Sequence, residues 1–348
     1  MVALLEADIA ANVKNLQAQQ DADGWISAAD LFARGIDTIP TLIEIVPKYG
    51  IAVIAGSSDT GKSSFLRHFG LCIVSGRDFL GWPINATYGR VLYVSTEDDE
   101  EAMTPLIRKQ AKAMGLTADD MQGFNFLFDT DNLLVKLDKR LTREPVDVVF
   151  LDCFSDLFGG DTNKDTAVRG FMEDFRMLAA KHKCLMFFLH HTGKGKEDFT
   201  PSKNNLLGSR AIEAKSRLAI ELKTDNADPD TKHLCVVKAN YLPAKYKQES
   251  YDLTFSDDLI FTSLGSRTPF ERLQKVSNRV VERYGQIIEL KEQGKTYEEI
   301  GAEIGCSKGN VSKIMKKTET AFPCFHPLGN GNGNKEKTDV NDDAELPF

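Results

Sequence analysis

The chain has 348 residues, of which 42% are hydrophobic, and a formal net charge of −8. This length predicts a main domain with one appendage, and the apolar content is enough for a sizeable buried core, which excludes a wholly disordered chain. The negative charge excludes a surface uniformly coated with positive charge for nucleic acid, but it leaves room for local basic surfaces.

The six cysteines are scattered along the chain without a CxxC pair. Because neither a disulfide framework nor a zinc site fits this spacing, we expect reduced thiols in a cytosol. The first residues include acids rather than a basic stretch and an apolar core, and no apolar run approaches the roughly eighteen residues that span a bilayer. The sequence therefore predicts a cytoplasmic protein with no membrane partner.

Four regions follow one another along the chain. Residues 1–35 carry apolar side chains at roughly helical spacing, which predicts a helical arm. Residues 36–265 alternate β-rich apolar runs with helical stretches, which predicts an α/β domain with a mainly parallel sheet flanked by helices. Residues 266–320 are helical and locally basic, which predicts a small all-α domain. The Gly/Asn bias of residues 321–348 predicts a disordered linker and an acidic tail.

Six apolar runs are the predicted strands of the α/β domain. They are 51-IAVIAG, 91-VLYVSTE, 146-VDVVFLD, 184-CLMFFLHH, 217-RLAIEL and 234-LCVVKAN. The last two runs are short and close together, so we expect them to continue the sheet as hairpins.

A glycine-rich loop follows the first strand and precedes a helical stretch. The loop reads G-x-x-x-x-G-K-S, the pattern of a P-loop that binds ATP phosphates through backbone N–H groups and a helix N-terminus. Lys62 is expected to reach the β and γ oxygens, and the Ser63 hydroxyl is expected to ligate Mg²⁺. The predicted ATP-binding residues are Gly56, Ser57, Ser58, Asp59, Thr60, Gly61, Lys62, Ser63 and Ser64.

Two acidic residues stand at predicted strand ends. Asp152 ends 146-VDVVFLD about ninety residues after the P-loop, which is typical of a Walker B aspartate that holds Mg²⁺. Glu97 closes 91-VLYVSTE, and ligands of open parallel sheets lie at the carboxyl ends of strands. We therefore expect Glu97 to act as general base on the attacking water, unless it is a solvated loop acid like the four acids that follow it.

The strand 184-CLMFFLHH ends in His190 and His191. A polar residue at this strand end is expected to sense the γ-phosphate, and His191 is the candidate. Paired histidines can also bind a metal ion, but the sequence offers no third ligand at a suitable spacing.

Together these motifs resemble the RecA-like P-loop ATPases, and within them the AAA-family group of the plasmid replication helicase RepA. The resemblance covers about residues 36–265 and includes Leu189-His190-His191-x-x-Lys194 and the later 208-GSRAIEAKSRLAIEL. It implies a homo-oligomeric ring, usually a hexamer, that acts on DNA with ATP and Mg²⁺ at the subunit interfaces.

In such a ring, the resemblance implies an arginine finger from the neighbouring subunit. Arg217 holds the matching position, with Arg210 and Lys238 as alternatives. Related helicases carry Lys-x-Arg on the last strand, whereas this chain has Lys238-Ala239-Asn240, and Arg217 can instead be a surface ion-pairing residue. Two loops, 159-GGDTNKD and 193-GKGKEDFTPSKNN, are candidates for contact with DNA or are plain surface loops.

Residues 285–317 match a helix-turn-helix pattern, in which Gly301 lies at the helix crossing, Gly305 makes the turn and Ser307 caps the second helix. A protein-docking helical domain is the alternative. The outward face of the second helix is suited to phosphates and base edges. The predicted DNA-binding residues are Lys308, Asn310, Lys313, Lys316 and Lys317.

The chain ends in an acidic stretch followed by Leu346-Pro347-Phe348. This end resembles the tail of bacterial single-stranded DNA-binding protein, which implies that Pro347 and Phe348 bind replication or repair enzymes. The leading functional hypothesis is thus an ATP-hydrolysing motor or replication accessory protein of a mobile element. An ATP-switched regulator that binds duplex DNA and an adaptor that presents the tail remain alternatives.

Overall fold

The computed structural model describes residues 25–161, 164–193, 195–196, 198–207, 210–275 and 278–321. Most of the predicted N-terminal arm, residues 1–24, and the linker and tail from residue 322 onward lie outside the described residues. So do the side chains of Arg210 and Lys317. Of the arm, the structure describes the short helix α2 (Ala28–Ala33), which begins with a capping box at Ser27.

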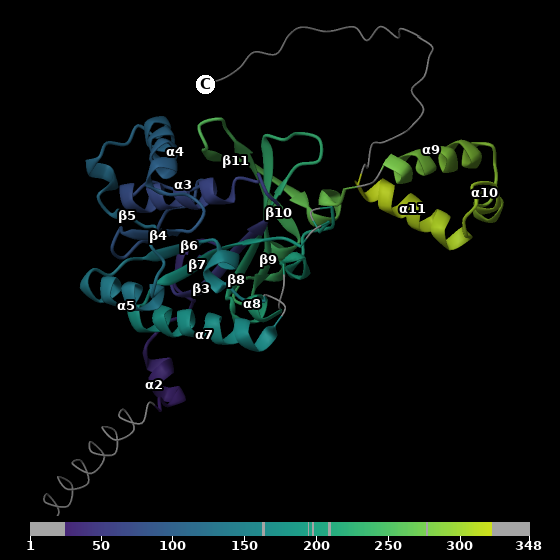
Figure 1. The fold of residues 1–348 in the computed structure, drawn as a ribbon. Coiled ribbons are helices and arrows are strands. Elements are labelled where there is room, and N and C mark those ends of the chain that lie inside the picture. Colours follow the sequence, from purple (N-terminus) through teal and green to yellow (C-terminus); the bar gives the residue numbers. More distant parts are fainter. Residues whose placement is uncertain are drawn as a thin grey trace, which may run out of the picture.

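A nine-stranded sheet forms the centre of the molecule, in the order β11-β10-β9-β8-β3-β7-β6-β4-β5 (Figure 1). Neighbours from β8 to β5 are parallel, whereas β9, β10 and β11 are added antiparallel. This arrangement confirms the mainly parallel sheet and its hairpin continuation. The strands are β3 (Gly50–Gly56), β4 (Val91–Ser95), β5 (Phe124–Leu127), β6 (Val148–Asp152), β7 (Leu185–His191), β8 (Leu218–Thr224), β9 (Thr231–Ala239), β10 (Glu249–Phe255) and β11 (Phe261–Pro269). A separate small hairpin, β1 (Thr41–Ile43) with β2 (Val46–Pro47), precedes β3.

Helices cover both faces of the parallel part of the sheet (Figure 1). Successive strand residues point to opposite faces, so Ala52 and Ile54 pack in one core with Phe69 of α3, while Ile51 and Val53 pack in the other. Because both faces are buried, these strands are apolar throughout, which explains why the sequence reveals them. The helices of this domain are α3 (Lys62–Ser75), α4 (Glu100–Ala113), α5 (Leu133–Arg143), α6 (Phe154–Phe158), α7 (Asp165–His182) and α8 (Arg210–Lys215).

Three strands that the apolar runs do not predict lie at or near the edges of the sheet: β5, β10 and β11. Strand β11 crosses the predicted domain boundary at 265, because it stays paired with β10 up to Pro269. The short 3-10 helix Phe270–Leu273 that follows packs Phe270 and Leu273 against Cys235 of β9. The folded unit that contains the sheet thus extends beyond residue 265.

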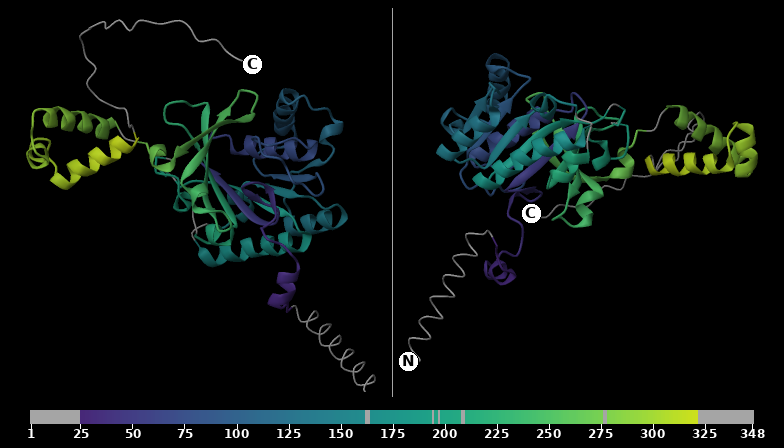
Figure 2. Two further views of the ribbon diagram at one scale, coloured as in Figure 1. Left: turned by 180° about the vertical axis from the view of Figure 1, so that it is seen from behind. Right: turned by 60° about the horizontal axis from the view of Figure 1, so that its bottom comes forward.

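The helices α9 (Asn278–Glu292), α10 (Tyr297–Glu303) and α11 (Lys308–Ala321) have an apolar core of their own, and Figure 2 shows them beside the sheet domain. A side chain at Gly301 would place its Cβ 2.5 Å from the Cys306 carbonyl, so only glycine allows this close approach. Gly305 follows the end of α10 with φ +69°, a left-handed conformation that favours glycine in the turn to α11. Across the part of the chain that the structure describes, no helix has both the length and the apolar character needed to cross a membrane.

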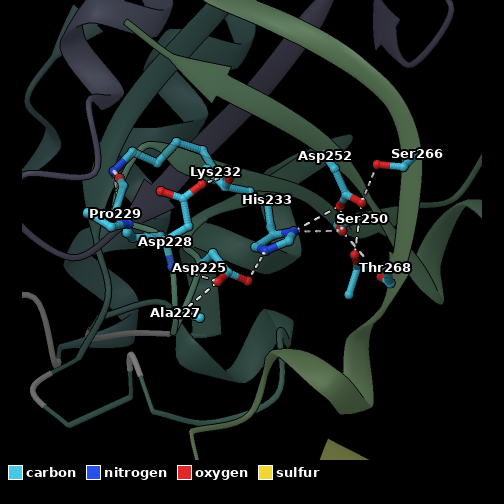
Figure 3. A network of polar contacts seen from close by, with 12 residues as sticks. Asp225, Ala227, Asp228, Pro229, Lys232, His233, Ser250, Asp252, Ser266 and Thr268 are labelled. Carbon is cyan, nitrogen blue, oxygen red and sulfur yellow. Dashed lines mark hydrogen bonds and ion pairs between the residues drawn. The ribbon is translucent and has the colours of Figure 1, made fainter. Parts of the chain in front are cut away.

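A polar network joins the three antiparallel strands (Figure 3). The buried His233 of β9 lies between two carboxylates, with Nδ1 2.9 Å from Asp252 Oδ1 and Nε2 2.9 Å from Asp225 Oδ2. Ser266 and Thr268 of β11 donate hydrogen bonds to the other oxygen of Asp252. A side chain from each of three strands therefore meets one buried carboxylate.

This network makes stability depend on pH. Burial alone would lower the pKa of His233, but its two carboxylate partners raise it above the ordinary 6.5. Burial alone would raise the pKa of Asp252, but the hydrogen bonds from His233, Ser250 and Thr268 hold it at about 2. The histidine contribution is complete below pH 6.5 and is lost as pH rises through the raised pKa. The aspartate contribution is complete above pH 3.8 and is lost as pH falls toward 2.

We therefore expect the free energy of unfolding to be higher near pH 6 than near pH 9, and His233→Gln to reduce that difference. Urea unfolding of both proteins at the two pH values measures it. His68→Gln, on α3 and outside this network, is the control, because burial lowers the pKa of His68 to about 4 and the imidazole is neutral at both pH values; it should leave the difference close to that of the wild type. An unchanged difference in His233→Gln would show that the network does not set this pH dependence.

Candidate active site

The predicted P-loop connects β3 to α3 as a closed turn. Gly56 ends β3, and a Cβ there would lie 2.6 Å from the Leu222 carbonyl, so the loop passes too close to β8 for any other residue. Gly61 precedes α3 with φ +84°. Within the turn, the Ser57 carbonyl accepts hydrogen bonds from the Thr60 hydroxyl at 3.0 Å and from Lys62 Nζ at 2.7 Å. The backbone of the loop is thereby shaped around a small open space.

A pocket of about 270 Å³ opens beside this loop. Its lining includes predicted phosphate-binding, metal-binding and catalytic residues from three separate parts of the chain, so the fold brings them together. The lining residues are Ser58, Asp59, Gly61, Lys62, Ser63, Ser64, Glu97, Leu189 and His191. Burial lowers the pKa of Lys62, and the nearby carboxylates of Asp152 and Glu97 oppose that shift.

Asp152 lies at the end of β6, buried, with its two oxygens in different surroundings. Tyr93 of β4 donates its hydroxyl to Oδ2, whereas Oδ1 is buried without a hydrogen-bond partner. Burial raises the pKa of Asp152, and the hydrogen bond from Tyr93 and the nearby hydroxyl of Ser63 oppose the rise. An unpartnered buried carboxylate oxygen close to a serine hydroxyl fits a hard divalent cation such as Mg²⁺, which Ser63 and Asp152 could hold.

Glu97 lies two residues beyond the end of β4, not on the strand itself. The Ser95 hydroxyl donates to the Asp98 carbonyl at 2.7 Å and accepts from the Asp98 N–H at 3.2 Å, which turns the chain. This turn places the Glu97 carboxylate at the pocket, with Oε1 4.0 Å from His191 Nε2.

The two histidines at the end of β7 point to opposite sides of the sheet, because side chains alternate along a strand. His191 faces the pocket, where burial, and then Lys62, lower its pKa. His190 is buried on the other side, with Nε2 2.8 Å from the Leu207 carbonyl, and burial lowers its pKa to about 4. Both imidazoles are therefore neutral near pH 7, and only His191 belongs to the pocket.

Two of the predicted finger residues, Arg217 and Lys238, do not line the pocket of their own chain. Arg217 precedes β8 and packs along Gly50, at the opposite end of β3 from the P-loop. The seven residues of β3 correspond to roughly 20 Å at about 3.3 Å per residue. Lys238 of β9 lies near the same end of the strands, because it pairs with Ala219 of β8. Its Nζ is 3.2 Å from Glu213 Oε1.

The predicted DNA-binding residues lie on α11, and Lys308, Asn310, Lys313 and Lys316 are exposed. The Nζ of Lys308 forms an ion pair with Glu298 of α10 at 2.8 Å. The side chain of Lys317, the tail residues Pro347 and Phe348, and parts of the loops after Gly159 and Gly193 lie outside the described residues.

Three residues around Asp152 belong to no recognised sequence motif: Tyr93, Thr96 and Cys153. The Thr96 hydroxyl accepts from the Cys153 N–H at 3.0 Å and lies 2.9 Å from Asp156 Oδ2, so it joins the ends of β4 and β6. The only sequence signal for Tyr93 is its position inside the predicted strand 91-VLYVSTE, four residues before Glu97. That signal becomes informative only when Ser95 is known to pair with Asp152.

Comparison with known proteins agrees with this geometry. Residues 26–197 match the family model described as AAA domain. A solved structure described as "ATPase Domain of G40P" is similar at a TM-score of 0.50 and 13% sequence identity, covering 73% of this chain and 97% of that chain. A search of curated proteins found no match. The P-loop between β3 and α3 and the shared sheet architecture show that the core of this chain has a RecA-like fold, and the part of it up to residue 197 resembles an AAA domain.

Proposed function

We propose that this protein binds ATP with Mg²⁺ and hydrolyses it as a motor or switch that acts on DNA. The observation that supports this most directly is the convergence of Lys62, Ser63 and Glu97 on one pocket next to the unpartnered Asp152 Oδ1. A structural P-loop without turnover would not need a carboxylate at the γ-phosphate end of the pocket. The four groups cover phosphate binding, metal binding and activation of water.

In this proposal each side chain has one task. Lys62 neutralises the β and γ oxygens of ATP, and the loop N–H groups hold the phosphates. Ser63 and Asp152 hold Mg²⁺, which when bound neutralises phosphate charge. Glu97 accepts a proton from the water that attacks the γ-phosphorus, and ADP leaves as the β–γ bond breaks. The neutral His191, 4.0 Å from Glu97, is placed to register whether the γ-phosphate is present.

The direct test is the rate of ATP hydrolysis by the purified protein of known oligomeric state, without DNA and with single-stranded or double-stranded DNA. We expect hydrolysis that DNA accelerates. If neither form of DNA changes the rate of hydrolysis, the claim that the protein acts on DNA is wrong. If no hydrolysis occurs in any of the three conditions, the claim that it is an ATPase is wrong.

We further propose that the active form is a ring in which Arg217 completes the ATP site of a neighbouring subunit. The support is positional: Arg217 is exposed at the amino end of β8, at the opposite end of the parallel strands from its own P-loop, so it is not available to its own pocket. An arginine supplied across an interface stabilises charge in the transition state of phosphoryl transfer.

Mixing two inactive variants tests this arrangement. We expect Arg217→Ala and Lys62→Ala to be inactive separately and to recover part of the activity in mixed rings, where an intact Lys62 pocket meets an intact Arg217. Steady-state ATP hydrolysis across a range of mixing ratios measures the recovery, and Arg143→Ala on α5 serves as the arginine control. A mixture that stays as inactive as its components would assign Arg217 a structural role.

We propose that α9, α10 and α11 form a helix-turn-helix that binds duplex DNA through α11. The exposed side chains of Lys313 and Lys316 on α11 support this, because phosphate contacts dominate nonspecific DNA affinity. A regulator switched by ATP is the second candidate function, favoured by the separate core of this helical unit.

The double substitution Lys313→Ala with Lys316→Ala should weaken duplex binding and reduce the log–log salt slope by about 0.9 per lost phosphate contact. Fluorescence anisotropy at several salt concentrations measures both effects. Lys295→Ala is the matched control in the same helical unit, because Lys295 lies in the turn between α9 and α10 and not on α11. Equal affinity and slope in the double variant would favour a protein-docking role for α11.

The finer assignments complete the proposal. A helicase of the RepA group should unwind a forked duplex in an ATP-dependent reaction, whereas a regulator should bind a specific duplex without unwinding it. The tail, with Pro347 and Phe348, is proposed to bind replication or repair enzymes that recognise the single-stranded DNA-binding protein. An activity lost only when the last eight residues are deleted would identify an adaptor.

A further inference from the structure

Three side chains of different chemistry meet beside the P-loop: the carboxylate of Glu97, the thiol of Cys153 and the imidazole of His191. One ligand atom of each lies within 4.8 Å of those of the other two, and Glu97 Oε1 is 4.0 Å from His191 Nε2. The residues follow β4, follow β6 and end β7, which are neighbouring strands. The register of the sheet, rather than the sequence spacing, therefore assembles this group.

Thiolate, imidazole and carboxylate are the donors that Zn²⁺ uses in proteins, at about 2.3, 2.0–2.1 and 2.0–2.2 Å. Ligand atoms of a tetrahedral zinc ion lie roughly 3.3–3.7 Å apart, as these bond lengths require. The Glu97–His191 separation is 4.0 Å and the other two are within 4.8 Å, so the side chains must approach one another on binding a cation. The Glu97 side chain is 54% exposed and is free to rotate toward the other two. Three protein ligands with a fourth position open toward a pocket is a common zinc geometry.

We propose that Glu97, Cys153 and His191 bind one thiophilic divalent cation, with Zn²⁺ as the best-fitting ion, at a position separate from the Mg²⁺ held by Ser63 and Asp152. Mg²⁺ is a hard ion that takes oxygen ligands and does not select a thiolate, so the cysteine distinguishes the two positions. On binding, the Cys153 S–H bond breaks, the proton passes to solvent and a sulfur–metal bond forms without change of oxidation state.

A cation in this position would inhibit ATP hydrolysis. Glu97 and His191 border the pocket that we assign to the γ-phosphate, so a cation bound to both removes the proposed base and occupies that space. This consequence, unlike the binding itself, depends on the proposed function. It predicts that Zn²⁺ and ATP with Mg²⁺ compete for the same end of the pocket.

The binding test uses the metal-free full-length protein and Co²⁺ as a spectroscopic probe. We expect one equivalent of Co²⁺ to produce a thiolate-to-cobalt charge-transfer band in the near ultraviolet. Cys153→Ser should lose the band and weaken binding by more than the roughly 10–100-fold that loss of an outer-shell partner costs. Cys306→Ser, in the turn between α10 and α11, is the matched control and should keep both band and affinity.

Circular dichroism shows whether Cys153→Ser is folded. If it is misfolded, His191→Asn provides the test instead. In that variant the cobalt band should persist at an altered position, and Co²⁺ should bind more weakly. A band that is absent from the wild type, that persists in Cys153→Ser or that His191→Asn leaves unchanged would overturn the proposal.

A second measurement separates this proposal from the proposed function. Each protein is assayed for ATP hydrolysis with and without Zn²⁺ and compared with its own zinc-free rate. Wild type should lose at least about tenfold in rate at saturating zinc, and Cys153→Ser should need a correspondingly higher zinc concentration. A cobalt band without any ATP hydrolysis would contradict the proposed ATPase function and support the metal site. ATP hydrolysis without a cobalt band would support the ATPase function and contradict the metal site.

Discussion

Glu97→Gln should bind ATP nearly as well as the wild type but hydrolyse it at least about 100-fold more slowly, which is the usual cost of losing a general base. The amide keeps the size and polarity of the side chain but cannot accept a proton from water. ATP affinity by titration and turnover in single-turnover conditions separate the two effects.

The control for this variant is Glu101→Gln, an exposed acid in the first turn of α4 only four residues away. It removes the same charge from the same acidic stretch without touching the pocket. Turnover should stay within about twofold of the wild type, as for an exposed residue far from the reacting atoms. Normal turnover in Glu97→Gln itself would end its assignment as the base.

Lys62→Ala should lose both ATP affinity and turnover, with turnover reduced by at least about 10²–10³-fold, as when one preorganised donor to transition-state charge is removed. Lys62 is 6% exposed and donates a hydrogen bond from Nζ to the P-loop carbonyl of Ser57, so its charge is fixed beside the pocket. The same two measurements, affinity and single-turnover rate, test this result.

Lys139→Ala, an exposed lysine of α5, is the matched control and should leave both values unchanged. If Lys62→Ala retained turnover within about tenfold of the wild type, the pocket beside the P-loop would not be the site of hydrolysis.

The buried centre of the fold could be predicted because strands such as β3 and β7 are buried on both faces and are therefore apolar throughout. Strand β5 is only four residues long and half-buried, and its alternating Asn125 breaks the apolar run. Strand β11 is largely exposed at the sheet edge. Neither strand has a pattern of apolar residues that distinguishes it from a loop in the sequence.

The residues of the candidate site also fall into those that the sequence predicts and those that it does not. Lys62, Ser63 and Asp152 are predictable because a local motif or a strand end carries each of them. Tyr93 and Cys153 matter through pairing between β4 and β6, and sequence spacing does not contain that register. The metal-ligating group shows this most clearly: the sequence offers no third ligand near the histidines, and the sheet supplies two from distant segments.

The crossing of residue 265 by β11 matters for anyone who shortens this chain. A fragment that stops at 265 would cut the edge strand in half, expose part of β10 to unwanted pairing, and uncover Cys235 where Phe270 and Leu273 normally shield it. A fragment that ends near 275 keeps that shield and leaves out the helical unit, whose apolar core comes from residues after 278, but it gives up the contacts between α11 and the 3-10 helix Phe270–Leu273. The fragment that ends at 265 should therefore be less soluble than the fragment that ends near 275, whatever their catalytic activities.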